Sequence, residues 1–445
     1  MAVSFWDLIV APYIIVVVLA VSSIIKKRNE ERDPGYKFYV WGVSAKIVGA
    51  IALCLIYTFY YNGGDTVNYF LTAETFCNML VKNPAVFTDV VIFGNITPEN
   101  YSYFDSSTGY PMYWWDPHTI FVARLIVPLV LVTFKSFVGS AILLGWICYT
   151  GVWKLYMLFT ERFPLIRREL AISILFIPSV VFWGSGLLKD TITLSAVGWY
   201  AFSFHEFFIK KRFKPVHGIA LLISAFLLVA IKPYILFALL PGSIIWLSNE
   251  QTARISNRVL RTLSTPVLLV AGVSLGLFIL SQMGDYLGIY SVDNVFSRAV
   301  LVQQDLKKDY YGGNTFDIGD FDASLGSMLS KAHLAVSAAL FRPTIFDTKN
   351  VVMLLSALEN TYITLLTAFL LFRLRFIGFF GIIWKDPLLL FSLLFALFFA
   401  FAVGLSTPNF GSLVRLKIPC IPFYVSSLFV IRHLYEQKFN RKLGI

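Results

Sequence analysis

Long apolar stretches recur along the whole chain of 445 residues, and they constrain its fold more than any other feature. Hydrophobic residues make up 57% of the chain and charged residues only 14%, whereas a soluble domain carries about 25% charged residues. Only α-helices and closed barrels satisfy all their backbone hydrogen bonds inside a lipid bilayer. These stretches lack the alternation of apolar and polar residues that is typical of a barrel strand. We therefore expect an all-α polytopic transmembrane bundle, built as one integral membrane domain over residues 1–445.

The apolar stretches predict about eleven membrane spans. We place these spans at residues 8–25, 44–61, 140–159, 170–186, 191–208, 216–231, 234–247, 267–283, 351–372, 387–405 and 416–431. Several of them are shorter than the roughly 20 residues that cross a bilayer at right angles.

The basic residues predict the orientation of the spans. Most of the 37 Lys and Arg residues fall in six short segments, at 26–37, 162–168, 210–214, 254–261, 373–385 and 432–442. If all six face the cytoplasm, the N-terminus lies outside and the C-terminus inside. Two long loops, 62–139 and 284–350, then lie outside. We expect a multi-pass protein of a plasma membrane, which in a bacterium is the inner membrane.

Residues 118–134 are apolar enough to span the membrane, which would reverse the side of every later loop. We instead expect an interfacial helix in the first outward loop, with Asp116, His118 and Arg124 toward the headgroups. Both loops are rich in aromatic or acidic residues, as in NYSYFDSSTGYPMYWWDPH, so both are expected to fold onto the bundle.

Composition also excludes several kinds of site. The net charge of +11 fits the excess of basic residues on the inner side of membrane proteins. The basic residues form no patch with interleaved aromatic residues, so nucleic acid is not expected as a partner. Neither the cysteines nor the histidines show metal-ligand spacing, so we predict no metal site from them. The cysteines are Cys54, Cys77, Cys148 and Cys420, and the histidines are His118, His205, His217, His333 and His433.

Asp65 follows two glycines just beyond the second expected span, in the segment YYNGGDTVNYF. A carboxylate there can act as a general base toward an acceptor hydroxyl, or as a ligand of a hard cation. It can also be an ordinary N-cap for a helix that starts at Thr66.

Two further segments place cations in outward turns. In GSGLLKDTITL, Lys189 can hold a phosphate, although Asp190 can also be a simple N-cap and Lys189 a snorkelling lysine. In LLVAIKPYILF, the triplet Lys232–Pro233–Tyr234 interrupts an apolar run, which predicts a turn with a cation at the outer surface. Such a lysine can also serve only as an interfacial anchor.

Two charged residues belong to the late spans. Arg415, in NFGSLVRLKIPCIPF, is expected at the outward start of the last span, where it would oppose the helix dipole. A phosphate or carboxylate partner would explain it, and so would contact with headgroups. Glu359 lies inside the ninth expected span, where an ionisable group marks a functional site or a buried partner. Lys232 and Arg415 are candidate partners for it.

The order of these segments resembles the GT-C superfamily of membrane glycosyltransferases, which use polyprenyl-phosphate-linked sugars. Similar features are the acidic residue in GGDTVNYF, the segments VTFKSFVGS and YMLFTERF, the polar turn in IPSVVFWGSGLLKDTITL, the Lys-Pro turn in AFLLVAIKPYILFALLPG, and the late NFGSLVRLKIPCIPF. The resemblance extends over residues 44–423. Each motif is short, and their order carries the resemblance.

The resemblance implies that Asp65 is the catalytic base or a metal-linked acid, with a divalent cation as a possible cofactor, and that outward cations hold the lipid phosphate. The candidates for binding carrier or substrate are Lys189, Asp190, Lys232, Tyr234, Arg415, Glu359, Arg124 and Asp116. We expect sugar transfer from a polyprenyl-phosphate carrier to a glycan, lipid or protein acceptor, with membrane lipids as further partners. A polysaccharide polymerase of the same fold, and a non-enzymatic lipid-carrier transporter or envelope-complex subunit, are the alternatives.

Overall fold

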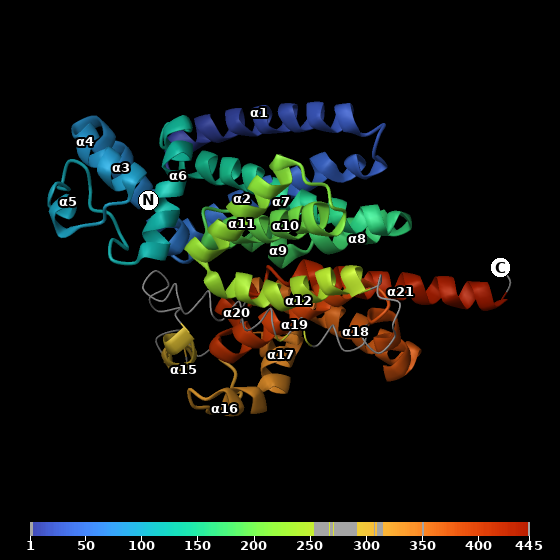
Figure 1. Ribbon diagram of the computed structural model, residues 1–445. Helices are drawn as coiled ribbons and strands as arrows, with labels where there is room; N and C mark the ends of the chain where they lie inside the picture. Colours follow the sequence, from blue (N-terminus) through green and yellow to red (C-terminus); the bar gives the residue numbers. More distant parts are fainter. Residues whose placement is uncertain are drawn as a thin grey trace. The chain divides into compact units, whose positions relative to one another are not determined.

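The computed structural model describes residues 3–252, 292–306, 308, 315–348 and 351–443, together with positions 267 and 270. Within these residues the secondary structure is helical, with one isolated bridge between Thr315 and Asn409 and no strand (Figure 1). The expected all-α class is therefore confirmed. The chain divides into two compact units. Unit 1 comprises Met1–Met157, Val181–Trp199 and Ile223–Lys232, and unit 2 comprises Leu158–Val180, Tyr200–Leu222 and Pro233–Ile445.

Far fewer helices than expected are long and apolar enough to cross a membrane. In the described part of the chain there are 5, or up to 6 if one pair of helices bent by 68° forms a single span. These helices are Phe5–Asn29, Pro34–Tyr60, Phe137–Arg162, Met353–Ile383 and Pro387–Ser406, and the bent pair is Phe410–Leu416 with Ile421–Lys438. The coarse prediction of a helical membrane protein agrees with this, but the prediction of eleven spans does not.

The remaining apolar runs form helices that are broken or short. The run at 170–186 is divided between α8 (Arg167–Leu175) and α9 (Pro178–Trp183). α10 (Lys189–Phe204) has 16 residues and α11 (Pro215–Ile231) has 17, so each is only about 25 Å long, less than the roughly 30 Å of a hydrocarbon core. The expected span at 267–283 lies outside the described residues, apart from position 270.

Unit 1 contains α1 (Phe5–Asn29) and α2 (Tyr39–Leu55), which pack side by side (Figure 1). A 3-10 turn (Pro34–Phe38) precedes α2 and a π-helical turn (Ile56–Tyr60) extends it. α7 (Phe137–Arg162) meets α10 through small residues. A Cβ on Gly151 would lie 2.1 Å from the Ser195 carbonyl oxygen, and a Cβ on Gly198 would lie 2.1 Å from the Gly151 carbonyl oxygen. Glycine is thus required where these two backbones approach each other.

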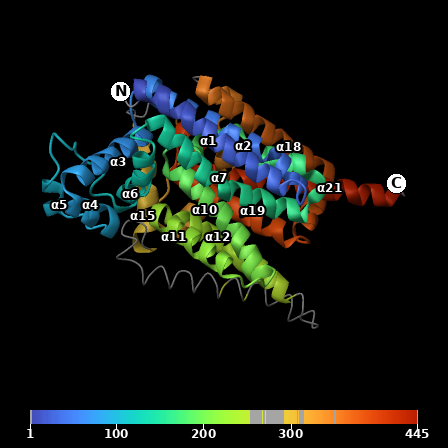
Figure 2. The same cartoon turned by 90° about the horizontal axis from the view of Figure 1, so that it is seen from above.

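The segment expected as the first outward loop is mostly helical. It holds α3 (Asp65–Lys82), α4 (Pro84–Phe87), a π-helical turn (Thr88–Phe93), α5 (Pro98–Ser102) and α6 (Pro117–Val132). α3 packs against α6 (Figure 2). Phe76, Phe104 and Trp114 are buried beneath these helices, which agrees with the expectation that the aromatic loop folds.

Unit 2 is organised around α19 (Pro387–Ser406), which contacts α12 (Pro233–Thr252), α17 (Ala332–Phe341) and α21 (Ile421–Leu443). Phe391, Phe395 and Phe399 of α19 are fully buried and form its core. The other helices of this unit include α15 (Val292–Leu306), α16 (Leu325–Ser330), α18 (Val351–Ile383) and α20 (Phe410–Leu416), with short turns at Pro164–Ile166, His205–Ile209 and Ile345–Asp347.

Candidate functional site

Asp65 opens α3 and does not cap it. The N-cap is Gly64, so Asp65 is the first helical residue, and the expectation of a helix starting at Thr66 is wrong by one position. Gly63 and Gly64 have φ angles of 136° and 118°, values that favour glycine. A Cβ on Gly64 would also come within 2.8 Å of the Tyr57 ring. The two glycines therefore shape the turn that presents the Asp65 carboxylate.

The Asp65 carboxylate is partly exposed and lies beside a phenol. Tyr113 donates its hydroxyl to Asp65 Oδ1 at 3.2 Å, and the Asn68 amide donates to the same phenol oxygen at 3.0 Å. Tyr113 is itself 37% exposed. The Asp65 carboxylate is therefore held beside the Tyr113 phenol at a place that solvent can reach.

Lys189 contributes a cation to the same region of unit 1. Its amine donates to Thr119 Oγ1 at 2.5 Å and lies 3.9 Å from Asp116 Oδ2. Burial lowers the pKa of Lys189. The charges of Asp116 and Asp65 oppose this change, and the charge of Lys232 adds to it. The direct contacts of Lys189 are thus with Thr119 and Asp116, and the Asp65 carboxylate adds only a weaker electrostatic effect on this amine.

Asp190 and Lys232 form a buried ion pair. Asp190 is fully buried, the Lys232 side chain is 8% exposed, and the amine contacts Asp190 Oδ1 directly. Because α10 begins at Lys189, Asp190 is its second residue and not its N-cap. The prediction that Lys232 is a cation at an outer surface is therefore wrong. A buried amine is stable here because its charge is compensated within the protein.

Asp116, His118 and Arg124 also have partners inside unit 1. Asp116 caps α6 by accepting from the His118 and Thr119 backbone amides. Burial opposes ionisation of Asp116, but hydrogen bonds from Thr119 and the charge of Lys189 outweigh it and lower the pKa of this carboxyl. His118 Nδ1 lies 2.7 Å from the Ala230 carbonyl oxygen.

Arg124 donates to the Val91 and Ile92 carbonyl oxygens at 2.9 and 3.2 Å. The contacts of Asp116, His118 and Arg124 thus hold α6 in place, and their orientation toward headgroups stays a prediction.

Glu359 of unit 2 binds the start of α9. Its carboxylate accepts from the Ser179 backbone amide at 2.8 Å and from the Ser179 hydroxyl at 2.6 Å. An acidic group suits a helix N-terminus because of the helix dipole. Among the described residues, Ser179 is thus the partner of Glu359, in place of the two expected cations, Lys232 and Arg415. Tyr234, also in unit 2, stacks on Phe399 with ring centroids 6.0 Å apart.

Arg415 lies in the last turn of α20, whereas the following long helix α21 begins at Ile421. A cation in a last turn is favourable for the helix dipole, so the argument that Arg415 opposes the dipole is wrong. Its role in phosphate binding stays a prediction.

A further group in unit 2 has the composition of a metal site. One ligand atom each from Glu161, His205 and Glu206 lies within 4.8 Å of the others. Lys210 contacts both carboxylates, and Arg212 donates to Glu206 at 3.1 Å. These two cations already compensate the two carboxylates, so we describe the group as an ion-pair cluster. Its members are too scattered along the chain for a local motif to indicate it.

Several buried charged residues were also missed. Lys417 is fully buried and donates to Asn360 Oδ1 at 2.8 Å, and Lys46 donates to the Gly184 carbonyl oxygen at 2.8 Å. Asp7 accepts from the Ser136 hydroxyl at 2.7 Å. The available signal was an ionisable residue next to or inside an apolar run.

No family model, curated protein or solved structure matches this chain.

Proposed function

We propose that this protein is a membrane glycosyltransferase that moves a sugar from a polyprenyl-phosphate carrier to an acceptor hydroxyl. The observation that supports it is the Asp65 carboxylate, which is partly exposed beside the Tyr113 phenol and belongs to the same compact unit as the Lys189 cation. This combination offers a base for the acceptor and a cation for the leaving group. The GT-C resemblance of the surrounding segments is a second line of support.

The reaction uses the two charges in different ways. Asp65 takes the proton of the acceptor hydroxyl as the acceptor oxygen bonds to the anomeric carbon of the sugar. The bond between that carbon and the phosphate oxygen breaks, and its electron pair leaves with the carrier phosphate. Lys189 compensates the negative charge that develops on this phosphate. A bound phosphate would also favour the charged form of Lys189, against the effect of burial.

The site would act on the outward side of a bacterial inner membrane, with the N-terminus outside and the C-terminus in the cytoplasm. The distribution of the basic segments supports this orientation. A polymerase of the same fold would use the same base and cation on a longer acceptor, so its chemistry at Asp65 is the same.

Asp65→Asn is the decisive test, because it retains size and most hydrogen bonding but removes the base. We expect turnover to drop by roughly 10²–10⁴-fold, the usual contribution of a general base, while folding and carrier binding remain. Turnover is measured with purified protein and a panel of polyprenyl-phosphate sugars.

Asp105→Asn is the matched control, since Asp105 lies in the same segment, is paired with Lys82 and is 52% exposed. Its turnover should equal that of the wild type. Near-normal turnover in Asp65→Asn would exclude the glycosyltransferase mechanism and favour a lipid-carrier transporter or a structural subunit.

Lys189→Gln tests the phosphate contact separately. A charge-assisted hydrogen bond contributes about 1.5–3 kcal/mol, so carrier affinity should fall by roughly ten- to a hundredfold. Lys82→Gln, which removes an exposed lysine from the same unit, should leave the affinity unchanged. Equal affinities for both variants would remove Lys189 from the site.

A further inference from the structure

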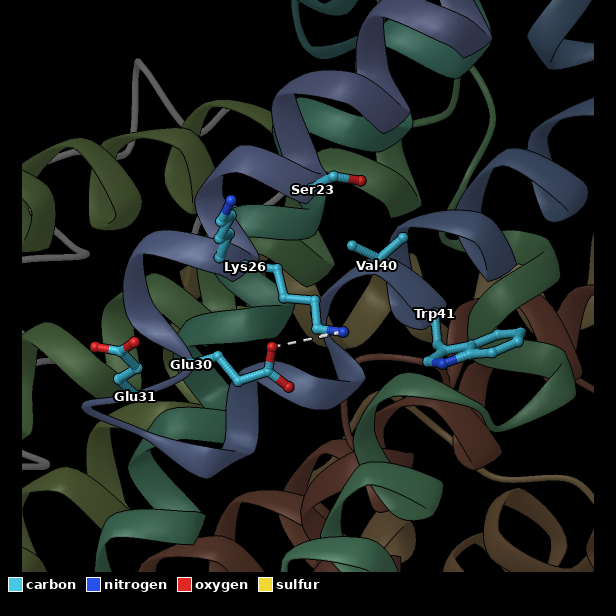
Figure 3. Close-up of a pocket in the computed structure, with 7 residues that line it drawn as sticks. Ser23, Lys26, Glu30, Glu31, Val40 and Trp41 are labelled. Atoms are coloured by element: carbon cyan, nitrogen blue, oxygen red, sulfur yellow. Dashed lines mark ion pairs between the residues drawn. The ribbon is translucent and has the colours of Figure 1, made fainter.

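A cavity of about 770 Å³ lies between the end of α1 and the start of α2 (Figure 3). Ser23, Lys26, Lys27 and Glu30 line it from α1 and its C-terminal end, and Val40 and Trp41 line it from the other side. Its volume is that of a small-molecule site. All of its lining residues belong to unit 1 and lie in a part of the chain separate from Asp65 and Lys189.

The charged groups of this cavity balance one another. With Glu31, the lining has two lysines and two glutamates, so its formal charge is zero. Lys26 and Glu30 are 3.6 Å apart, with side chains 34% and 41% exposed. An exposed pair of this kind is weak, so both groups are available to a ligand. Figure 3 shows Lys26 and Glu30 directed toward the side of Trp41, whereas Glu31 turns away. A ligand that matches this cavity has both a positive and a negative charge.

The surroundings of the cavity are apolar and exposed. Trp41 is 69% exposed, and Val17, Val21 and Ile24 of α1 are 41%, 36% and 52% exposed. Both helices are long and apolar enough to span a membrane. Tryptophan is enriched at the level of the headgroups, and a basic helix end beside an apolar face is typical of the same depth. The ligand that joins a charged head to long apolar chains is a phospholipid.

We propose that this cavity binds the head group of a phospholipid that carries a phosphate and a primary ammonium group, namely phosphoethanolamine. Lys26 and Lys27 hold the phosphate, Glu30 accepts from the ammonium group, and the Trp41 ring lies beside that cation. The acyl chains then lie along the exposed apolar residues of α1. This inference does not depend on the proposed transferase activity.

Other head groups fit less well. An anionic head group such as phosphoglycerol would meet the Glu30 carboxylate without a positive group of its own to compensate it. A quaternary ammonium group cannot donate a hydrogen bond to Glu30, and its usual recognition uses a cage of several aromatic rings, whereas Trp41 is the one aromatic residue that lines this cavity. The charges therefore favour phosphoethanolamine over both.

The test compares lipids retained by the purified full-length protein, measured by native mass spectrometry with phosphatidylethanolamine, phosphatidylcholine and phosphatidylglycerol of identical acyl chains. We expect the wild type to retain phosphatidylethanolamine preferentially. Lys26→Gln should lower that retention by roughly tenfold or more, because one charge-assisted contact is lost. Trp41→Ala should lower it as well. These side chains are exposed, so both variants should fold, which circular dichroism verifies.

Lys37→Gln is the matched control, since Lys37 lies outside the cavity with its amine over the Phe38 ring. It should retain phosphatidylethanolamine like the wild type. Glu30→Lys makes the cavity cationic and should shift the preference to phosphatidylglycerol. Equal retention of the three lipids by the wild type, preference of the wild type for phosphatidylglycerol, or wild-type retention in Lys26→Gln and Trp41→Ala would each overturn the proposal. So would displacement of the bound lipid by soluble phosphoethanolamine at equal concentration, because the acyl chains would then contribute nothing.

Discussion

At the scale of single residues, several charges that marked candidate sites in the sequence have partners within the fold. Asp190 pairs with Lys232, Asp116 caps α6, and Arg124 holds two backbone carbonyls. The sequence singled out these residues by their charge and by their place in or beside apolar runs. The partner of a charge is set by contacts between distant segments, such as that of Asp190 with Lys232, 42 positions further along the chain, and no local pattern reveals it.

The Asp190–Lys232 pair yields a prediction about stability. Lys232→Met removes the amine that contacts the fully buried Asp190 carboxylate, and removing one partner of a buried ion pair costs about 3–5 kcal/mol. Asp190→Asn combined with Lys232→Met removes both charges and should recover most of that loss. Thermal unfolding of the purified protein measures the three variants. If the effects of the two single substitutions simply add in the double variant, the pair does not act as a unit.

Asp116 yields a prediction about pH. Its pKa is lowered in the folded protein, so its stabilising contribution is complete above the ordinary value for aspartate, about 4, and is lost as the pH falls through the lower folded value. Amide hydrogen exchange at the start of α6 should therefore accelerate, relative to its intrinsic rate, below about pH 4. Asp116→Asn retains a capping side chain and should show no such pH dependence in this range.

At the scale of elements, the sequence was reliable where an apolar run was long and uninterrupted. α1, α2, α7, α18 and α19 all coincide with expected spans. The prediction of spans was unreliable where an apolar run contains a helix break, because mean hydropathy does not detect such a break. The run at 170–186 is interrupted between α8 and α9 just before Pro178, since the residue before a proline is disfavoured in a helix.

The small-residue contact between α7 and α10 can be tested by enlarging one glycine. Gly151→Val would place new atoms against the Ser195 carbonyl, where a Cβ alone comes within 2.1 Å. Overpacking of this kind typically costs 1–3 kcal/mol, so about that loss of stability is expected in thermal unfolding. Gly381→Val is the control, because no atom lies within 4 Å of a Cβ added there in α18. Equal unfolding temperatures for the two variants would contradict the close packing.

At the scale of the whole molecule, the sequence predicted the all-helical class of the fold, whereas the roles of Asp65 and Lys189 stay predictions. It did not indicate Tyr113 as the partner of Asp65, because a tyrosine in an aromatic-rich loop has no distinguishing local pattern. The two compact units are assembled from non-contiguous segments. A reading of consecutive apolar runs cannot reveal this division, since it follows from long-range contacts such as that between Lys46 and Gly184.

Membrane orientation is the last prediction, and cysteine labelling tests it. The four native cysteines are buried, so the background is low. Ser107→Cys, in the first outward loop, should react with an impermeant thiol reagent applied from outside. Glu31→Cys and Phe213→Cys lie next to basic residues and should react only after permeabilisation.

All three positions are exposed, so accessibility depends on the side of the membrane. If Glu31→Cys reacts from outside and Ser107→Cys is protected, the orientation is the reverse of the predicted one. A third outcome is that Phe213→Cys and Ser107→Cys both react from outside while Glu31→Cys is protected. It would show that one more crossing lies between the two positions, and 118–134, the sequence of α6, is the apolar run that could supply it. Asp65 precedes that run, so its outward position would survive this result, whereas Lys189 would move to the opposite face and could no longer serve the same reaction.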